Sequence, residues 1–132
     1  MKTVENAMVK NQAVMIVDDY PPLLQIVIRM LRKAGYSKVF QATNGFHCLQ
    51  LAQKNIIDVI LLDISMPGIN GMDTCKVLRS SATNNHAHII ACTAHANEIH
   101  RQTFLEAGFN DILPKPFGYS ELIDKLTGSP NK

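Results

Sequence analysis

Short apolar runs alternate along the chain with longer segments of helical period. The runs are Ala13–Val17, Val39–Ala42, Val59–Leu62, Ile89–Cys92 and Ile112–Leu113. Most of them are shorter than a helix requires, and several are continuously apolar rather than alternating. This pattern is typical of strands that are buried on both faces of a parallel sheet. We therefore predict five strands.

The segments between the runs carry helical signals. Pro21 and Pro22 suit the first turn of a helix, and Gly35 suits its C-cap. Between them, apolar residues recur at helical spacing at Leu24, Val27, Ile28 and Leu31. Further helices are predicted at about 45–54, 70–79, 97–107 and 119–127. Five strands and five helices in strict alternation most simply form a parallel sheet with helices on both faces, joined by right-handed crossovers.

Composition narrows the classes of protein that this chain can represent. Its 132 residues suit one domain, and 46% hydrophobic with 18% charged residues allow a sizeable core. A net charge of +2 gives no support for direct nucleic-acid binding. The three cysteines include no CxxC pair, so a disulfide framework or a cysteine-rich zinc site is not expected.

The chain has polar ends around this central region. We expect residues 1–12 to be a leader or linker, 13–127 to be the domain, and 128–132 to be a tail. The longest apolar run has five residues, far from the ~20 that cross a bilayer, so membrane insertion is not expected. The N-terminus shows no apolar signal segment, which favours the cytoplasm.

Polar side chains that can bind a metal or take part in group transfer follow the apolar runs. Asp18 and Asp19 follow the first, Asp63 the third, Thr93 the fourth and Lys115 the fifth. In open α/β sheets, ligands bind outside the carboxyl ends of the strands. If the first and third strands are neighbours, three carboxylates converge there and favour a hard cation such as Mg²⁺. An aspartate beside a metal and a lysine can accept a phosphoryl group as a nucleophile.

The order and spacing of these residues resemble the response-regulator receiver domain of two-component signalling. The resemblance rests on Asp18-Asp19 after AVMIV, Asp63 in LLDISMPGING, Thr93-Ala94, and Lys115-Pro116-Phe117. The intervals between successive motifs are 44, 30 and 22 residues. The resemblance implies a single flavodoxin-like, doubly wound α/β domain whose five parallel strands lie in the order 2-1-3-4-5.

The resemblance also implies a role for each acidic residue. Asp63 would accept the phosphoryl group. Asp18, Asp19 and Asp63, with the backbone carbonyl of Ser65, would hold Mg²⁺, with Mn²⁺ as an alternative ion. Such a domain is not an enzyme in the usual sense, although its own chemistry forms and hydrolyses the aspartyl phosphate.

The remaining implied roles concern phosphoryl binding and switching. Thr93, Ala94 and Lys115 would contact the phosphoryl group, and the peptide bond before Pro116 would be cis. A Thr93 shift would then repack the fourth helix against the fifth strand. Many receivers carry Tyr or Phe three residues before the lysine, where this chain has Ile112, so an aromatic rotation is not expected.

The implied partners are proteins. The phosphodonor would be a sensor histidine kinase or a histidine phosphotransfer domain, and the output a downstream protein target. A second apolar stripe on the first helix, Leu23, Ile26 and Met30, is either part of a broad buried face or a docking surface for this donor. The motifs look most like receivers of hybrid kinases and phosphorelays, so the chain could belong to a larger membrane-anchored kinase. A monomer or weak dimer is expected.

Two other classes of protein share part of this pattern. A small Mg²⁺-dependent phosphatase with an aspartyl nucleophile would need an acid two residues after the first aspartate. Tyr20 and Pro21 stand at those positions. A flavin-binding module would need a phosphate-binding loop after the first strand, which Tyr20-Pro21-Pro22 obstructs. We therefore favour the receiver, with the phosphatase as the alternative.

Overall fold

The computed structural model describes residues 11–127, which form five strands and five helices. The predicted tail at 128–132 and the first ten residues of the predicted leader lie outside the described residues. Strands and helices alternate from Ala13 to Leu126, as the apolar pattern predicted.

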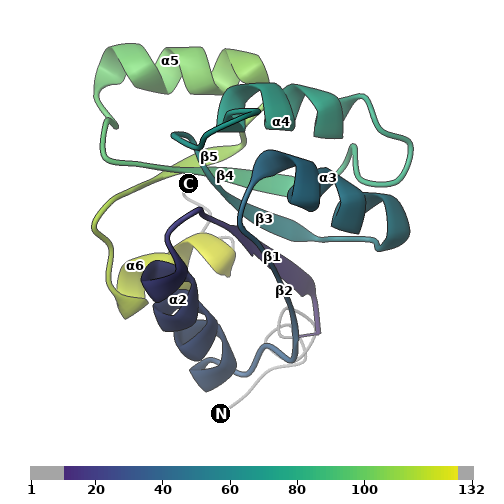
Figure 1. Cartoon of the computed structure of the whole chain (residues 1–132). Coiled ribbons are helices and arrows are strands. Elements are labelled where there is room, and N and C mark those ends of the chain that lie inside the picture. Colours follow the sequence, from purple (N-terminus) through teal and green to yellow (C-terminus); the bar gives the residue numbers. More distant parts are fainter. Residues whose placement is uncertain (1–10, 128–132) are drawn as a thin grey trace.

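The five strands form one parallel sheet (Figure 1). They are β1 (Ala13–Val17), β2 (Lys38–Ala42), β3 (Val59–Asp63), β4 (His88–Thr93) and β5 (Asp111–Pro114). Their order is β2-β1-β3-β4-β5, which confirms the flavodoxin-like topology. Every residue of β1 and of β3 is buried, because helices cover both faces of the sheet there. β2 lies on one side of β1, whereas β3, β4 and β5 follow one another on the other side. The order in which the chain adds strands to the sheet therefore reverses between β1 and β3.

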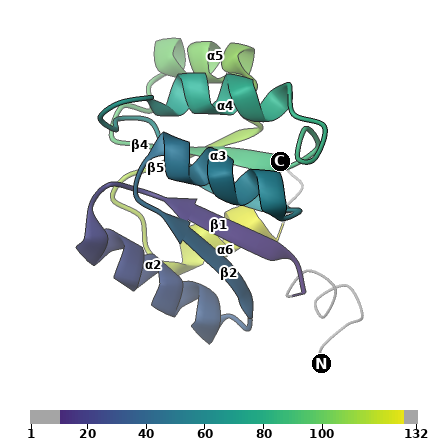
Figure 2. The ribbon, with the colours of Figure 1, turned by 45° about the vertical axis from the view of Figure 1, so that its right-hand side comes forward.

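The helices divide between the two faces of the sheet (Figures 1 and 2). They are α2 (Pro21–Lys33), α3 (Gly45–Lys54), α4 (Gly71–Arg79), α5 (Glu98–Ala107) and α6 (Tyr119–Leu126). One face carries α2 and α6, whose apolar residues form a core cluster with β1, β3 and β4. The other face carries α3, α4 and α5 over a second core cluster. The sheet is therefore the middle layer of three.

Local sequence signals explain where the helices begin and end. Asn44, Asn70 and Asn97 precede α3, α4 and α5, and each asparagine side chain accepts a hydrogen bond from a backbone N–H of the first turn. Gly108 caps α5 with φ 113°. The predicted cap of α2 is displaced by one residue: Ala34 is the C-cap, and Gly35 follows it with φ 104°, a value that favours glycine.

The strands extend slightly beyond the apolar runs. β3 includes Asp63, and β4 includes both His88 and Thr93, because the backbone ladder continues past the last apolar residue. Asp63 and Thr93 thus stand on the final residues of strands, whereas Asp18, Asp19 and Lys115 directly follow strands. Among the described residues, no helix has the length and apolar character needed to cross a membrane.

Candidate functional site: an acidic cluster at the carboxyl edge of the sheet

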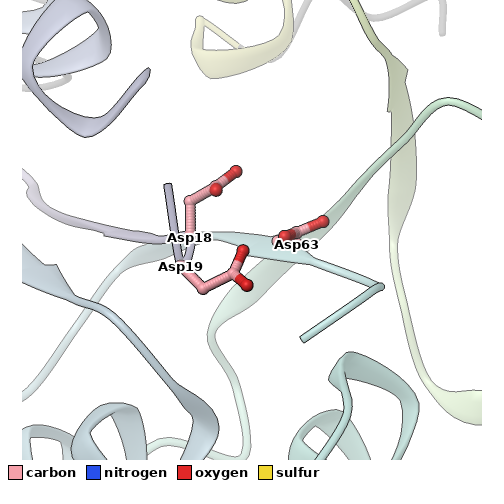
Figure 3. A group of neighbouring side chains, drawn as sticks. All are labelled: Asp18, Asp19 and Asp63. Carbon is pink, nitrogen blue, oxygen red and sulfur yellow. The ribbon is translucent and has the colours of Figure 1, made fainter. Parts of the chain in front are cut away.

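Three carboxylates from two neighbouring strands meet at the carboxyl edge of the sheet (Figure 3). β1 ends directly before Asp18 and Asp19, and β3 ends at Asp63. One oxygen of each carboxylate lies within 4.8 Å of an oxygen of the others. Asp18 and Asp63 are buried, at 2% and 5% exposure, whereas Asp19 is exposed. The strand order brings these residues together because it places β1 beside β3.

Lys115 places its ammonium group between the two buried acids. Its Nζ donates to Oδ2 of Asp18 at 2.9 Å and to Oδ1 of Asp63 at 3.2 Å. The lysine follows β5 by one residue, and its backbone N–H donates to the carbonyl oxygen of Thr93 at 2.8 Å. This backbone bond anchors the lysine to the end of β4, two strands from Asp18. One cation thus partly neutralises two acids that are distant in the sequence.

The buried charged groups shift one another's pKa values. Burial raises the pKa of Asp63 above its usual value, the negative charge of Asp18 raises it further, and Lys115 only partly opposes both. Burial lowers the pKa of Lys115, but its hydrogen bond to Asp18 and the charges of Asp63 and Asp18 more than offset this, so the pKa is raised overall. Lys115 is therefore charged, while Asp63 is a carboxylate held in an unfavourable environment.

Gly71 explains how the chain passes so closely behind Asp63. A Cβ atom at this position would overlap the carbonyl oxygen of Asp63, so only glycine fits. The tight return from the loop into α4 leaves the Asp63 side chain facing the carboxyl edge. The backbone N–H of Ser65 donates to Oδ1 of Asp63 at 3.3 Å, which orients the carboxylate.

Thr93 lies across the site from the acids. It is buried at 4% exposure, and its Oγ1 accepts a hydrogen bond from the backbone N–H of His95 at 2.9 Å. Ala94 is exposed and lines the same pocket, as does Ser65. The Lys115–Pro116 peptide bond is cis. Ile112 is buried at 2% exposure in the core cluster under α3, α4 and α5, where an aliphatic side chain leaves no ring to reorient.

The acids open into a cavity of about 610 Å³. Of the predicted docking stripe, Leu23 and Ile26 line this cavity, but Met30 is not among its lining residues. Ile26 is 46% exposed, whereas Leu23 and Met30 are partly buried against the core. The stripe is thus divided between the core and the pocket, and the docking role of its exposed part stays a prediction.

Side chains with rings complete the pocket wall. Tyr20 and Phe117 line the cavity together with His95. Phe117 belongs to the recognised Lys115-Pro116-Phe117 motif, while Tyr20 follows Asp19 and His95 stands two residues after Thr93, so the motifs indicated where these residues lie. The ring of His95, which precedes α5, also lies 6.0 Å from the ring of His100 on that helix.

The donor set fits a hard divalent cation. Three carboxylate oxygens within 4.8 Å of one another, two of them on buried side chains, can coordinate Mg²⁺ with water completing its octahedron. Cysteine is absent from the residues that line the cavity, and so are the thiolate ligands that would select softer metals.

The fold and the site define a doubly wound α/β domain that gathers acids, a lysine and a threonine at its topological switch point. The family model for the response regulator receiver domain matches residues 14–127. The chain therefore belongs to the response-regulator receiver family, a class of signalling domains rather than conventional enzymes, which confirms the family inferred from its motifs.

Known relatives agree with this assignment. The chain is similar to the chemotaxis protein CheY-3 of Vibrio cholerae, with 32% identity over 117 residues that cover 89% of this chain and 90% of that protein. The receiver domain of the sensor histidine kinase PA1611 from Pseudomonas aeruginosa has a TM-score of 0.80 and 33% identity. The match covers 88% of this chain and 94% of that one. A magnesium ion is coordinated in its active-site cleft.

A third comparison includes a signalling partner. The receiver domain of the response regulator Ssk1 from Saccharomyces cerevisiae was crystallised with the histidine phosphotransfer protein Ypd1. Its match has a TM-score of 0.81 and 25% identity, and covers 89% of this chain and 87% of that one. The similar proteins thus include a chemotaxis protein, the receiver of a sensor histidine kinase and a regulator bound to a histidine phosphotransfer protein.

Proposed function

We propose that residues 13–127 receive a phosphoryl group on Asp63. The observation that carries this proposal is the placement of a buried carboxylate 3.2 Å from the Lys115 ammonium and within 4.8 Å of two further acids. A carboxylate oxygen of Asp63 attacks phosphorus, the bond from phosphorus to the donor atom breaks, and the electron pair leaves with the donor. The product is an aspartyl phosphate.

Lys115 has two successive roles in this proposal. Before transfer it neutralises Asp18 and Asp63 through the two hydrogen bonds described above. As the phosphoryl group arrives, its ammonium pairs with a phosphoryl oxygen, because that group then carries the negative charge nearest to Asp63. Its side chain is 23% exposed, so it can follow the incoming group without leaving the pocket.

Asp18, Asp19 and Asp63, with the carbonyl of Ser65, are the residues that we propose hold Mg²⁺. When bound, the ion neutralises negative charge on the acids and on the transferring phosphoryl group. The magnesium in the similar PA1611 receiver supports this assignment. Mn²⁺, which prefers the same oxygen ligands, is expected to substitute for it.

Thr93 provides the step that converts phosphorylation into a signal. Its hydroxyl accepts the backbone N–H of His95 in this structure. A phosphoryl oxygen near Ala94 would accept a hydrogen bond from the Thr93 hydroxyl and draw this side chain toward it, since a charged acceptor forms a stronger hydrogen bond than a neutral one. Movement of Thr93 would release His95 and the segment leading to Asn97, the N-cap of α5. We propose that α5 and β5 repack in response and present a changed surface to a downstream protein.

A histidine-bearing protein is the phosphodonor that we propose. Ile26 and Leu23 form an apolar edge on the same cavity as Asp63, which suits a donor helix that brings its phosphohistidine to the acids. The Ypd1 complex of the similar Ssk1 receiver supports this class of partner. In this proposal the chain acts in the cytoplasm, alone as a monomer or weak dimer, or as the receiver of a larger hybrid kinase.

The docking edge can be tested separately from the acceptor. Ile26→Glu should slow transfer from a histidine phosphotransfer protein at least fivefold, because it buries a charge in the apolar contact. Val77→Glu is the matched control, since Val77 is also 46% exposed but lies on α4, away from the cavity. Equal rates for Ile26→Glu and the unchanged protein would remove the docking role.

Intact-mass analysis after incubation with acetyl phosphate tests the acceptor. The unchanged protein should gain one phosphoryl group when Mg²⁺ is present, and Asp63→Asn should gain none. Labelling of Asp63→Asn at the same rate would disprove the assignment. The same assay separates the receiver from the aspartyl phosphatase, because a phosphatase would turn over a phosphomonoester repeatedly. The family match supports the receiver.

A further inference from the structure

The cavity beside Asp63 is lined by charged and by apolar side chains, which we call its charged half and its apolar half. The charged half contains Asp18, Asp63 and Lys115. The apolar half is lined by Leu23 and Ile26 from α2 and by Phe117 from the segment before α6. A volume of about 610 Å³ falls within the range of small-molecule sites, which are mostly apolar with a few polar anchors. In the proposed function, the phosphoryl group and its ion would lie in the charged half.

Part of the apolar half is exposed to solvent. Ile26 keeps 46% of its surface exposed, and Tyr20, at the rim, keeps 61% exposed. Leu23 and Phe117 are only partly buried against the core cluster beneath α2 and α6. Four large side chains therefore present apolar surface to the same cavity that contains the phosphoryl acceptor, and a bound apolar group would remove that surface from water.

We infer that the apolar half binds the leaving group of small acyl phosphates, so that Asp63 reacts faster with aryl acyl phosphates than with acetyl phosphate. This inference rests on the proposed function of Asp63 and adds to it a class of small-molecule substrate. The charged half places the phosphoryl group, and the acyl group bonded to that phosphoryl then lies against the adjoining apolar wall.

The charge distribution in the cavity suits such a donor. Lys115 is the one lysine or arginine among the described residues that line it, and its Nζ lies 3.2 Å from Oδ1 of Asp63. Tyr20, Leu23, Ile26 and Phe117 carry no ionised group. A donor with its anionic end at Lys115 and its apolar end on α2 matches this arrangement, whereas a donor that is charged at both ends does not.

The transfer itself needs no additional reactant. An oxygen of the Asp63 carboxylate bonds to phosphorus, and the bond between phosphorus and the bridging acyl oxygen breaks. The electron pair leaves on the carboxylate product, benzoate in the case of benzoyl phosphate. No proton has to be supplied, since the leaving carboxylate is stable as an anion.

The test compares benzoyl phosphate with acetyl phosphate as donors to the full chain in the presence of Mg²⁺. Second-order rate constants for labelling of Asp63 are measured by intact mass and are divided by the rate at which the dianion of each donor hydrolyses without protein, because that reaction breaks the same phosphorus–oxygen bond. A phenyl ring partly buried against the wall should raise the corrected ratio about tenfold. A corrected ratio within twofold of one, with acetyl phosphate still labelling Asp63, would overturn the inference and leave the wall to a protein donor.

Two variants locate the effect. Ile26→Gln should reduce the corrected ratio three- to fivefold, because it removes an apolar contact from the wall. Val77→Gln should leave the ratio unchanged, since Val77 has the same 46% exposure but lies outside the cavity. Equal loss in both variants would contradict the inference. Failure of both donors to label the unchanged protein would instead disprove the proposed acceptor role itself.

Discussion

Replacing the proposed phosphoacceptor should make the protein more stable. Asp63→Asn keeps the shape of the side chain but removes a negative charge from a site that is 5% exposed. The raised pKa of Asp63 shows that the folded protein disfavours this charge, first because of burial and then because of Asp18. Removal of the charge should therefore favour the folded state, while it abolishes phosphorylation.

The size of the effect follows from the distances. Two negative charges 4.8 Å apart repel by about 3.5 kcal/mol at an effective dielectric constant of about 20. Lys115 at 3.2 Å attracts Asp63 by about 5 kcal/mol on the same scale. Asp18 and Asp19 both repel Asp63, although the exposed Asp19 is screened by water, and burial adds to their effect. The repulsion from the acids and the attraction to Lys115 nearly cancel, so the cost of burying the Asp63 charge remains. We therefore expect Asp63→Asn to raise the free energy of unfolding by about 1–2 kcal/mol.

Urea unfolding followed by far-ultraviolet circular dichroism measures this difference, since the chain contains no tryptophan. EDTA should be present, because Mg²⁺ offsets most of this difference in stability. At 10 mM Mg²⁺ and a dissociation constant of about 1 mM, the ion would stabilise the unchanged protein by about 1.4 kcal/mol. It should stabilise Asp63→Asn much less.

Asp124→Asn is the matched control, because it removes the same charge from an exposed position on α6. It should change stability by less than about 0.5 kcal/mol. If Asp63→Asn were less stable than the unchanged protein in EDTA, the repulsion inferred at the site would be wrong.

Three further predictions concern the core. Asn84→Ala should lower the free energy of unfolding by about 3 kcal/mol in the same urea assay, because the buried amide accepts from Ile57 N–H and donates to the carbonyls of Ala52 and Asn55. A loss below 1 kcal/mol would show that water replaces the hydrogen bonds of the Asn84 amide. Tyr36→Phe should be neutral or stabilising by up to about 1 kcal/mol, since the buried hydroxyl has no hydrogen-bond partner among the described residues. A clear destabilisation would refute this. Burial raises the pKa of Cys48 and Cys92 to about 12 and that of Cys75 to about 11, so iodoacetamide at pH 8 should label none of them until urea unfolds the chain. Mass analysis counts the adducts, and rapid labelling of the native protein would contradict the burial.

Much of the fold was determined by local sequence. Continuous apolar runs such as Val59–Leu62 predict buried strands, because a strand covered on both faces has no polar side. The asparagines before α3, α4 and α5 mark helix starts through hydrogen bonds that span only three residues. The candidate site followed from the same signals, since its polar residues stand where apolar runs end. Errors were confined to element ends, where ladder hydrogen bonds extended β3 and β4 past their apolar residues.

Contacts between distant segments were beyond the reach of these local patterns. Lys115 meets Asp18 across 97 positions of sequence, and only the strand order brings them to 2.9 Å. Arg79 is a second example: its guanidinium donates to the carbonyls of Ala87 and Gly108 and to the side chain of Asn110, so it joins α4 to the segments that precede β4 and β5. No motif marked this arginine.

The residues of α2 also show which features local sequence determines and which ones tertiary packing determines. The sequence identified Leu23, Ile26 and Met30 as one stripe, because helical period places them on one side of α2. Tertiary packing then assigned Met30 to the core and left Ile26 beside the acids. Periodicity reports which residues share a face of a helix, and it depends only on near neighbours in the chain. Which part of that face is covered depends on the core cluster that α2 shares with β1, β3, β4 and α6, and these elements reach α2 only when the sheet has assembled.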